Sequence, residues 1–347
     1  MKNKNINDDL KNLAMDQPEV PEKDPTDAGR PSMGYDRDFD AYIEKAINRR
    51  IKKIAARTFI VMLAAVVAVI FCISPLMRLI FPDAVRMEKD GQQLLTLMRA
   101  YYETTMPWKE VISLEAESDG FGCYTLNMDV TDLRRQQYIG EVNVQMAMRL
   151  GKLSVKNDPD HRTAFETGKF YTEKMEEVTD PDAMIEELEK LPESAIIYIS
   201  VSQKEASDVS TVMDRAGSML WWLQVYEPEN TFQAGVSTAM SASYGDRDTY
   251  RSQMTAAEIK QIYLENLGIL RDNMDIWKDL NVCSNSTVYY QAPQVIDEAI
   301  AAAQADDSFM TVNYCLAGSK EKVLDYLRSA DLAMLVVERV DAGGFGG

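Results

Sequence analysis

The stretch from residue 58 to residue 77, TFIVMLAAVVAVIFCISPLM, constrains the fold most, because its twenty residues include no charged side chain. At a rise of about 1.5 Å per residue, a helix of this length is roughly 30 Å long, the thickness of the hydrocarbon core of a bilayer. Backbone groups in lipid must be hydrogen-bonded within the segment, which requires a helix. We therefore predict a transmembrane helix, with bounds 58–81. The competing interpretation is a buried core helix, which fits less well because such helices seldom stay uncharged over this length.

The charges beside this stretch predict its orientation. Its N-terminal flank carries a cluster of basic residues: Arg49, Arg50, Lys52, Lys53 and Arg57. The other flank carries Arg78 and then a mixture of both signs. By the positive-inside rule, the N-terminus is cytoplasmic and the long C-terminal part is extracytoplasmic, in the cell membrane as a single-pass protein. A cleaved signal peptide is not expected, since its charged region would be 57 residues long.

The two sides of the stretch differ in charge. Residues 1–57 carry 12 basic and 11 acidic residues, whereas residues 82–347 carry 24 and 44, a net charge of −20. An acidic surface of this kind argues against nucleic acid and against anionic lipid as direct partners of the outer part. A solvated acidic surface is the simpler interpretation, and an acidic binding patch is the alternative.

Motifs for catalysis or metal binding are scarce. The cysteines Cys72, Cys123, Cys283 and Cys315 form no CxxC or Cys/His cluster, and His161 is the only histidine. We therefore expect no metal and no cofactor. Residues 319–322 fit the S-x-x-K pattern of penicillin-binding active sites, but its companion motifs are missing, and Ser319 is explained as a helix N-cap. The chain is expected to bind and not to catalyse.

The inner part is predicted to hold a disordered tail (1–35) and an amphipathic helix (36–57) that continues into the membrane helix. The apolar stripe of this helix recurs every four residues, at Phe39, Ile43, Ile47 and Ile51. One interpretation places the stripe on the membrane surface. The other makes it the docking face for a cytoplasmic partner.

The outer part is predicted to be α+β. Alternating apolar residues favour an antiparallel β region, and two later β-α-β units favour a ferredoxin-like arrangement. The predicted boundaries are a helical stalk (82–105), a β-rich region (106–176), an α+β domain (177–342) and a Gly-rich tail (343–347). Trp221 and Trp222 are adjacent in a strand and point to opposite faces, so we expect one to be in the core and the other to be covered by a neighbouring helix, with an exposed side chain as the alternative.

Three segments of this chain resemble a known family. FDAYIEKAINRRIKKIAARTFIVMLAAV is similar to the N-terminal part of the sigma factor regulator family of Gram-positive bacteria. SAIIYISVSQKEASDVSTVMDRAGSMLWWLQVY resembles the start of that family's C-terminal domain, and FMTVNYCLAGSKEKVLDYLRSADLAMLVVERV resembles its end. These proteins are membrane-anchored anti-sigma factors. The segments cover about 28, 33 and 32 residues and share mainly their apolar spacing.

The resemblance implies a function. The cytoplasmic segment would hold an extracytoplasmic-function sigma factor inactive, and the outer domain would respond to an unknown extracytoplasmic ligand. Residues 1–57 lack Cys and His, which excludes the zinc-binding type of anti-sigma domain. Two rivals remain open: an anchored, non-enzymatic interaction module of a cell-envelope assembly, and an enzyme whose activity depends on Ser319.

Overall fold

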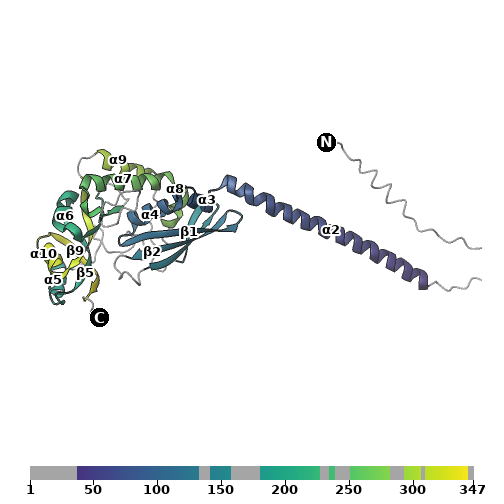
Figure 1. Cartoon of the computed structure of the whole chain (residues 1–347), viewed down its shortest axis with the longest axis horizontal. Helices are drawn as coiled ribbons and strands as arrows, with labels where there is room; N and C mark the ends of the chain where they lie inside the picture. The colour runs from purple at the N-terminus through teal and green to yellow at the C-terminus, as the bar shows by residue number, and fades with distance from the viewer. Residues whose placement is uncertain are drawn as a thin grey trace, which may run out of the picture. The chain divides into compact units, whose positions relative to one another are not determined.

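The structure is a computed structural model, and it describes residues 37–132, 141–157, 180–226, 234–238, 251–281, 293–305 and 309–342. The predicted disordered tail (1–35) and the Gly-rich tail (343–347) lie outside these residues. The chain divides into two compact units, Met1–Val67 and Ala68–Gly347. The boundary falls within one helix, α2 (Arg37–Ile80), which is continuous over 44 residues. This confirms that the predicted amphipathic helix continues without a break into the apolar stretch (Figure 1).

The first sheet is an antiparallel meander of β1 (Lys109–Gly120), β2 (Cys123–Asp132), β3 (Glu141–Arg149) and β4 (Lys152–Asn157). Every second residue of β2 is buried, as its alternating sequence predicts. Leu126 pairs with Met146, and Met128 pairs with Val144, so the apolar side chains share one face. This face belongs to the hydrophobic core.

The second sheet contains five described strands in the order β7-β6-β8-β5-β9, with every neighbouring pair antiparallel. Their bounds are β5 (Ile196–Asp208), β6 (Leu220–Gln224), β7 (Gly235–Ser237), β8 (Met310–Ser319) and β9 (Leu332–Asp341). One β-α-β unit contributes β5 and β6, and the other contributes β8 and β9. In the sheet, β8 lies between β5 and β6, and β5 lies between β8 and β9, so a strand of each unit separates the two strands of the other. This is the interleaved arrangement that the sequence predicts.

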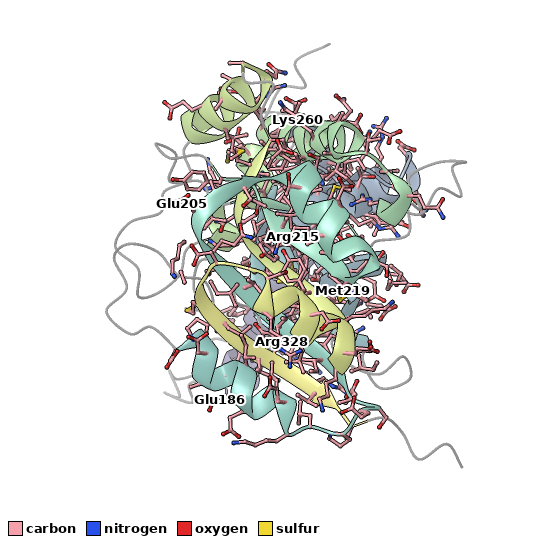
Figure 2. The ribbon with its side chains drawn as sticks, turned by 90° about the vertical axis from the view of Figure 1, so that its left-hand side faces the viewer. Glu186, Glu205, Arg215, Met219, Lys260 and Arg328 are labelled. Atoms are coloured by element: carbon pink, nitrogen blue, oxygen red, sulfur yellow. The ribbon has the colours of Figure 1, made fainter. Side chains whose placement is uncertain are left out.

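Helices complete the second unit. They are α5 (Pro181–Glu189), α6 (Val209–Ala216), α7 (Ala256–Asp272), α8 (Met274–Trp277), α9 (Pro293–Ala305) and α10 (Lys320–Arg328), with short 3₁₀ turns η1 (Gly217–Met219), η2 (Arg251–Gln253) and η3 (Lys278–Asn281). Figure 2 shows α5, α6 and α10 in front of the second sheet, where their residues Glu186, Arg215 and Arg328 are labelled. Inward residues of the strands, among them Ile197 and Ile199, are fully buried.

A smaller cluster holds the tryptophans of the second sheet. Trp222 is buried with Trp108, Cys315 and Ala317, and Trp221 packs partly buried against the same group. The expectation of one core tryptophan is therefore confirmed for Trp222, whereas Trp221 is only partly covered, by Trp108 between α4 and β1 and not by a helix. The strand register shifts between Leu220 and Trp222.

The prediction of a single helical stalk over 82–105 is wrong. This segment forms two helices, α3 (Ala84–Lys89) and α4 (Gln93–Thr105). The helix breaks because Gly91 and Gln92 adopt positive φ angles of 95° and 56°. Ten of the thirteen residues of α4 are buried, so α4 belongs to the core.

One boundary in the second sheet is also corrected. The sequence predicts a helix from Glu205 to Arg215 after the first strand of this sheet, but residues 205–208 still belong to β5. The pairing of β5 with β8 shifts between Ser202 and Ser207, which accommodates the extra residues in a bulge. Asp208 then caps α6 by accepting a hydrogen bond from the backbone N–H of Ser210 at 2.8 Å.

Candidate functional site

Helix α2 carries all the residues that the sequence nominates for partner binding. Phe39, Ile43, Ile47 and Ile51 lie within it, and the last three are exposed. A step of four residues advances the side chain by about 40° around a helix, so the four positions form one gently winding stripe. The structure thus places them on a single continuous element, with nothing in the described part of the chain covering the three isoleucines.

The basic residues Arg49, Arg50, Lys52, Lys53 and Arg57 occupy the same helix and are exposed. They immediately precede the apolar part of α2. Residues Tyr42–Ile80 make a helix long and apolar enough to cross a membrane, and none of its most apolar window is buried within the structure. A core helix of a soluble protein is mostly buried, which this helix is not, so the finding agrees with a membrane span or a signal sequence.

The chain leaves α2 through a short, well-fixed junction. Pro75 has no backbone N–H, so the last turns of the helix lack one hydrogen bond. The helical hydrogen bonding nevertheless reaches the end of α2, where Phe81 N–H donates to Met77 O at 2.9 Å. Asp83 then caps α3 by accepting from Arg86 N–H at 3.3 Å, and its carboxylate lies 3.6 Å from the guanidinium of Arg78.

A buried ion pair lies deeper in the second unit. The side chains of Glu103 in α4 and Arg251 in η2 are 1% and 2% exposed, and they form a bidentate ion pair. The Glu103 carboxylate also accepts from Ser237 N–H at 3.2 Å, while Arg251 donates to Ser237 O at 3.0 Å. Trp222 Nε1 donates to Glu103 O at 2.8 Å. These contacts fasten α4 to β6 and β7 of the second sheet.

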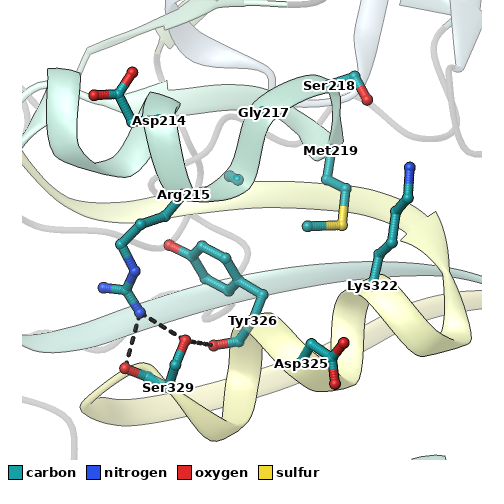
Figure 3. A pocket seen from close by; sticks show the side chains of 10 residues that line it. Asp214, Arg215, Gly217, Ser218, Met219, Lys322, Asp325, Tyr326 and Ser329 are labelled. Carbon is teal, nitrogen blue, oxygen red and sulfur yellow. Dashed lines mark hydrogen bonds between the residues drawn. The ribbon is translucent and has the colours of Figure 1, made fainter.

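A polar hollow of about 440 Å³ opens between α6 and α10 (Figure 3). Arg215 donates to Ser329 O at 2.8 Å and to Ser329 Oγ at 3.0 Å, and its guanidinium lies 5.1 Å from the centre of the Tyr326 ring. Asp214, Lys322 and Asp325 complete a rim of mixed charge. Such a rim creates no strong field of one sign, so it does not select an anion or a cation.

A buried tyrosine pair lies behind this hollow. Tyr326 Oη donates to Tyr314 Oη at 2.9 Å, and Gln203 Nε2 donates to Tyr314 Oη at 2.9 Å. Burial raises the pKa of both phenols, so both stay neutral at physiological pH. The arrangement supports packing and gives no activated nucleophile.

Catalytic and metal-binding candidates find little support in the described residues. No group of three His, Cys, Asp or Glu side chains there could hold a metal ion. His161 and Cys283 lie outside the described residues. Ser319 occupies the N-cap position of α10 as predicted, although its side chain makes no capping hydrogen bond. Lys320 is buried and donates to Leu191 O and to Glu193, both at 2.7 Å.

Comparisons with protein-family models, with curated proteins and with solved structures found no match for this chain. Sequence reasoning found the α2 residues but missed the Glu103–Arg251 pair, because nothing in a sequence indicates that charges 148 residues apart will meet.

Proposed function

We propose that this chain is a single-pass, membrane-anchored regulator of the anti-sigma type. The apolar part of α2 crosses the cell membrane, the N-terminus lies in the cytoplasm, and the acidic unit that follows lies outside. The stripe of Phe39, Ile43, Ile47 and Ile51 binds an extracytoplasmic-function sigma factor. The outer unit receives a signal by binding and not by catalysis.

One observation carries this proposal. None of the most apolar window of α2 is buried, whereas the residues after α2 form a large buried hydrophobic core. Leaving so much apolar surface in water would cost about 25 cal/mol per Å², so α2 needs a surrounding that the described chain does not provide. A bilayer supplies that surrounding for residues 58–77, and the basic flank favours a cytoplasmic N-terminus.

The second sheet gives the resemblance additional support. The two outer segments that resemble the sigma factor regulator family contribute β5, α6 and β6, and then β8, α10 and β9. Although they are far apart in sequence, these segments interleave in one sheet. Two halves of one domain would be expected to do this.

The test is capture of partners by the full-length, tagged chain, cross-linked in cells and solubilised from membranes. The wild-type chain should recover one sigma factor, and the Ile43→Asp, Ile47→Asp variant should not, because two carboxylates would be placed in the apolar docking face. The matched control is Ala41→Asp, Asn48→Asp, which adds the same charge to another face of the helix. Equal recovery by all three proteins would refute the docking stripe.

The runner-up is an anchored interaction module of a cell-envelope assembly, and the hollow between α6 and α10 is the observation that favours it. In that case residues 1–57 could be exchanged for an unrelated basic flank without loss of function. Cells carrying the exchanged chain would then keep their wild-type phenotype, whereas an anti-sigma factor would lose control of its regulon.

A further inference from the structure

Two hairpin tips in the first sheet expose large apolar side chains. Phe121 lies in the two-residue turn between β1 and β2, and Leu150 lies in the two-residue turn between β3 and β4. Their exposed fractions are 47% and 46%. Most other apolar residues of this sheet alternate into the core, so these two side chains stand out.

The backbone at both tips is unusual for these residue types. Phe121 and Leu150 have positive φ angles of 51° and 50°, and each is followed by a glycine whose φ is also positive. Two-residue turns with positive φ at both central positions strongly prefer Asn, Asp or Gly at the first position. A bulky apolar residue is disfavoured there, and the fold gains no core packing in return. Phe121 and Leu150 both stand where these turns prefer another residue type. Since neither side chain packs in the core, we expect both to contact something other than this protein's own fold.

The two tips lie together at the end of α2. Leu150 N–H donates to Gly122 O at 2.9 Å, which joins one turn to the other. A Cβ atom at Gly122 would lie 3.7 Å from Met77 Cβ, and one at Gly151 would lie 2.8 Å from Pro82 Cδ. Met77 is the last residue of the apolar stretch, so both turns pack on the chain where it would leave the membrane.

The tips are also held firmly in this place. Tyr124, three residues after Phe121, is hydrogen-bonded to Asp83 in the junction after α2. Asp83 in turn lies beside Arg78. These contacts join the first sheet to the end of α2, so Phe121 and Leu150 lie beside the point where the proposed span ends.

We propose that Phe121 and Leu150 insert into the interface of the phospholipid bilayer that α2 crosses, on its outer face, and so hold the first sheet against the membrane. This inference rests on the proposed function, since it requires α2 to be a span. Aromatic and aliphatic side chains are stable at the interfacial depth. The contact is confined to the two tips, because the acidic surface of the outer unit disfavours broad adhesion to anionic lipid.

The experiment places an environment-sensitive fluorescent amino acid at one position at a time in the full-length chain, reconstituted in phosphatidylcholine vesicles. The test positions are Phe121 and Leu150. The control within the same sheet is Ile112, which is 43% exposed but lies about 30 Å along β1 from the tip. The control for the span is Phe71, in the apolar part of α2. Quenchers attached to lipid headgroups and to mid-chain acyl positions report depth.

The expected result is a blue-shifted emission at Phe121 and Leu150 that the headgroup quencher reduces strongly, with Ile112 unaffected and Phe71 reduced by the mid-chain quencher. If Phe71 is quenched while Phe121 and Leu150 behave like Ile112, the tip inference fails and the span stands. If Phe71 is not quenched by either lipid, the span itself fails, and both proposals fall with it. Unchanged tryptophan emission in each labelled protein verifies that the fold is intact.

Discussion

Replacing Arg251 with methionine should destabilise the unit 68–347 by about 3–5 kcal/mol, because it leaves the Glu103 carboxylate buried without its countercharge. Glu103 is 1% exposed, so water cannot take the place of the guanidinium. In the cluster described above, the one remaining donor to its carboxylate is Ser237 N–H, at 3.2 Å. For a domain of this size, a loss of that magnitude lowers the melting temperature by roughly 10 °C.

Tryptophan fluorescence in detergent micelles provides the assay. All four tryptophans, Trp108, Trp221, Trp222 and Trp277, lie within 68–347, so their emission follows this unit alone. The matched control is Arg271→Met, since the pair of Arg271 with Asp272 is 43% and 66% exposed and should contribute less than about 1 kcal/mol.

A double variant separates the pair from the packing around it. Glu103→Met, Arg251→Met removes both charges together, and it should be more stable than Arg251→Met alone by about 2 kcal/mol or more. If the double variant instead loses as much stability as Glu103→Met and Arg251→Met lose when added together, the unpaired buried charge does not explain the loss in Arg251→Met. The reasoning would also be refuted if Arg251→Met were no less stable than the Arg271→Met control.

Two further predictions concern the same unit. Gly235→Ala should lower the free energy of unfolding by about 1–3 kcal/mol or more, because its Cβ would lie 2.0 Å from Trp222 Cζ2. The control is Gly268→Ala, inside α7 with open space around it, which should be neutral or stabilising in the same unfolding assay. Glu110→Gln should raise the melting temperature at pH 7, because burial raises the pKa of Glu110 and its ionised form therefore opposes folding. The gain should shrink as the pH falls from the raised pKa of the folded state towards the unfolded value, and it should vanish below about 4, where the carboxyl is protonated in both states; a gain that does not depend on pH would refute this explanation.

The features of the fold that were predicted correctly depend on residue patterns within one short segment. The alternation of Tyr124, Leu126, Met128 and Val130 predicts β2 and its buried face, and both are present. The two β-α-β units are also predictable, since each strand is an apolar run bounded by a helix signal. Their interleaving into one sheet follows from the general preference of such units for a split arrangement.

Sequence patterns did not predict the features that depend on turn geometry or on contacts between distant residues. The break at Gly91 and Gln92 depends on two positive φ angles that periodicity does not reveal. The extra length of β5 depends on a bulge opposite β8, which only the partner strand defines. The joined tips at Phe121 and Leu150 depend on how two hairpins pack on the end of α2, so neither residue was nominated from the sequence.

The contrast between α2 and α4 shows what decides burial in this chain. Helix α2 is the more apolar of the two, yet it is exposed, whereas α4 contains Arg99, Glu103 and three threonines and is largely buried. Four polar residues of α4 have partners: Thr104 and Thr105 hydroxyls donate to carbonyls of their own helix, Arg99 donates to Val111 O and Ile112 O, and Glu103 pairs with Arg251. Satisfied polar groups cost little to bury, so α4 can enter the core despite its charges. Within the described residues the apolar part of α2 meets no such partners, and this difference from α4 is the reason the proposed span rests on α2.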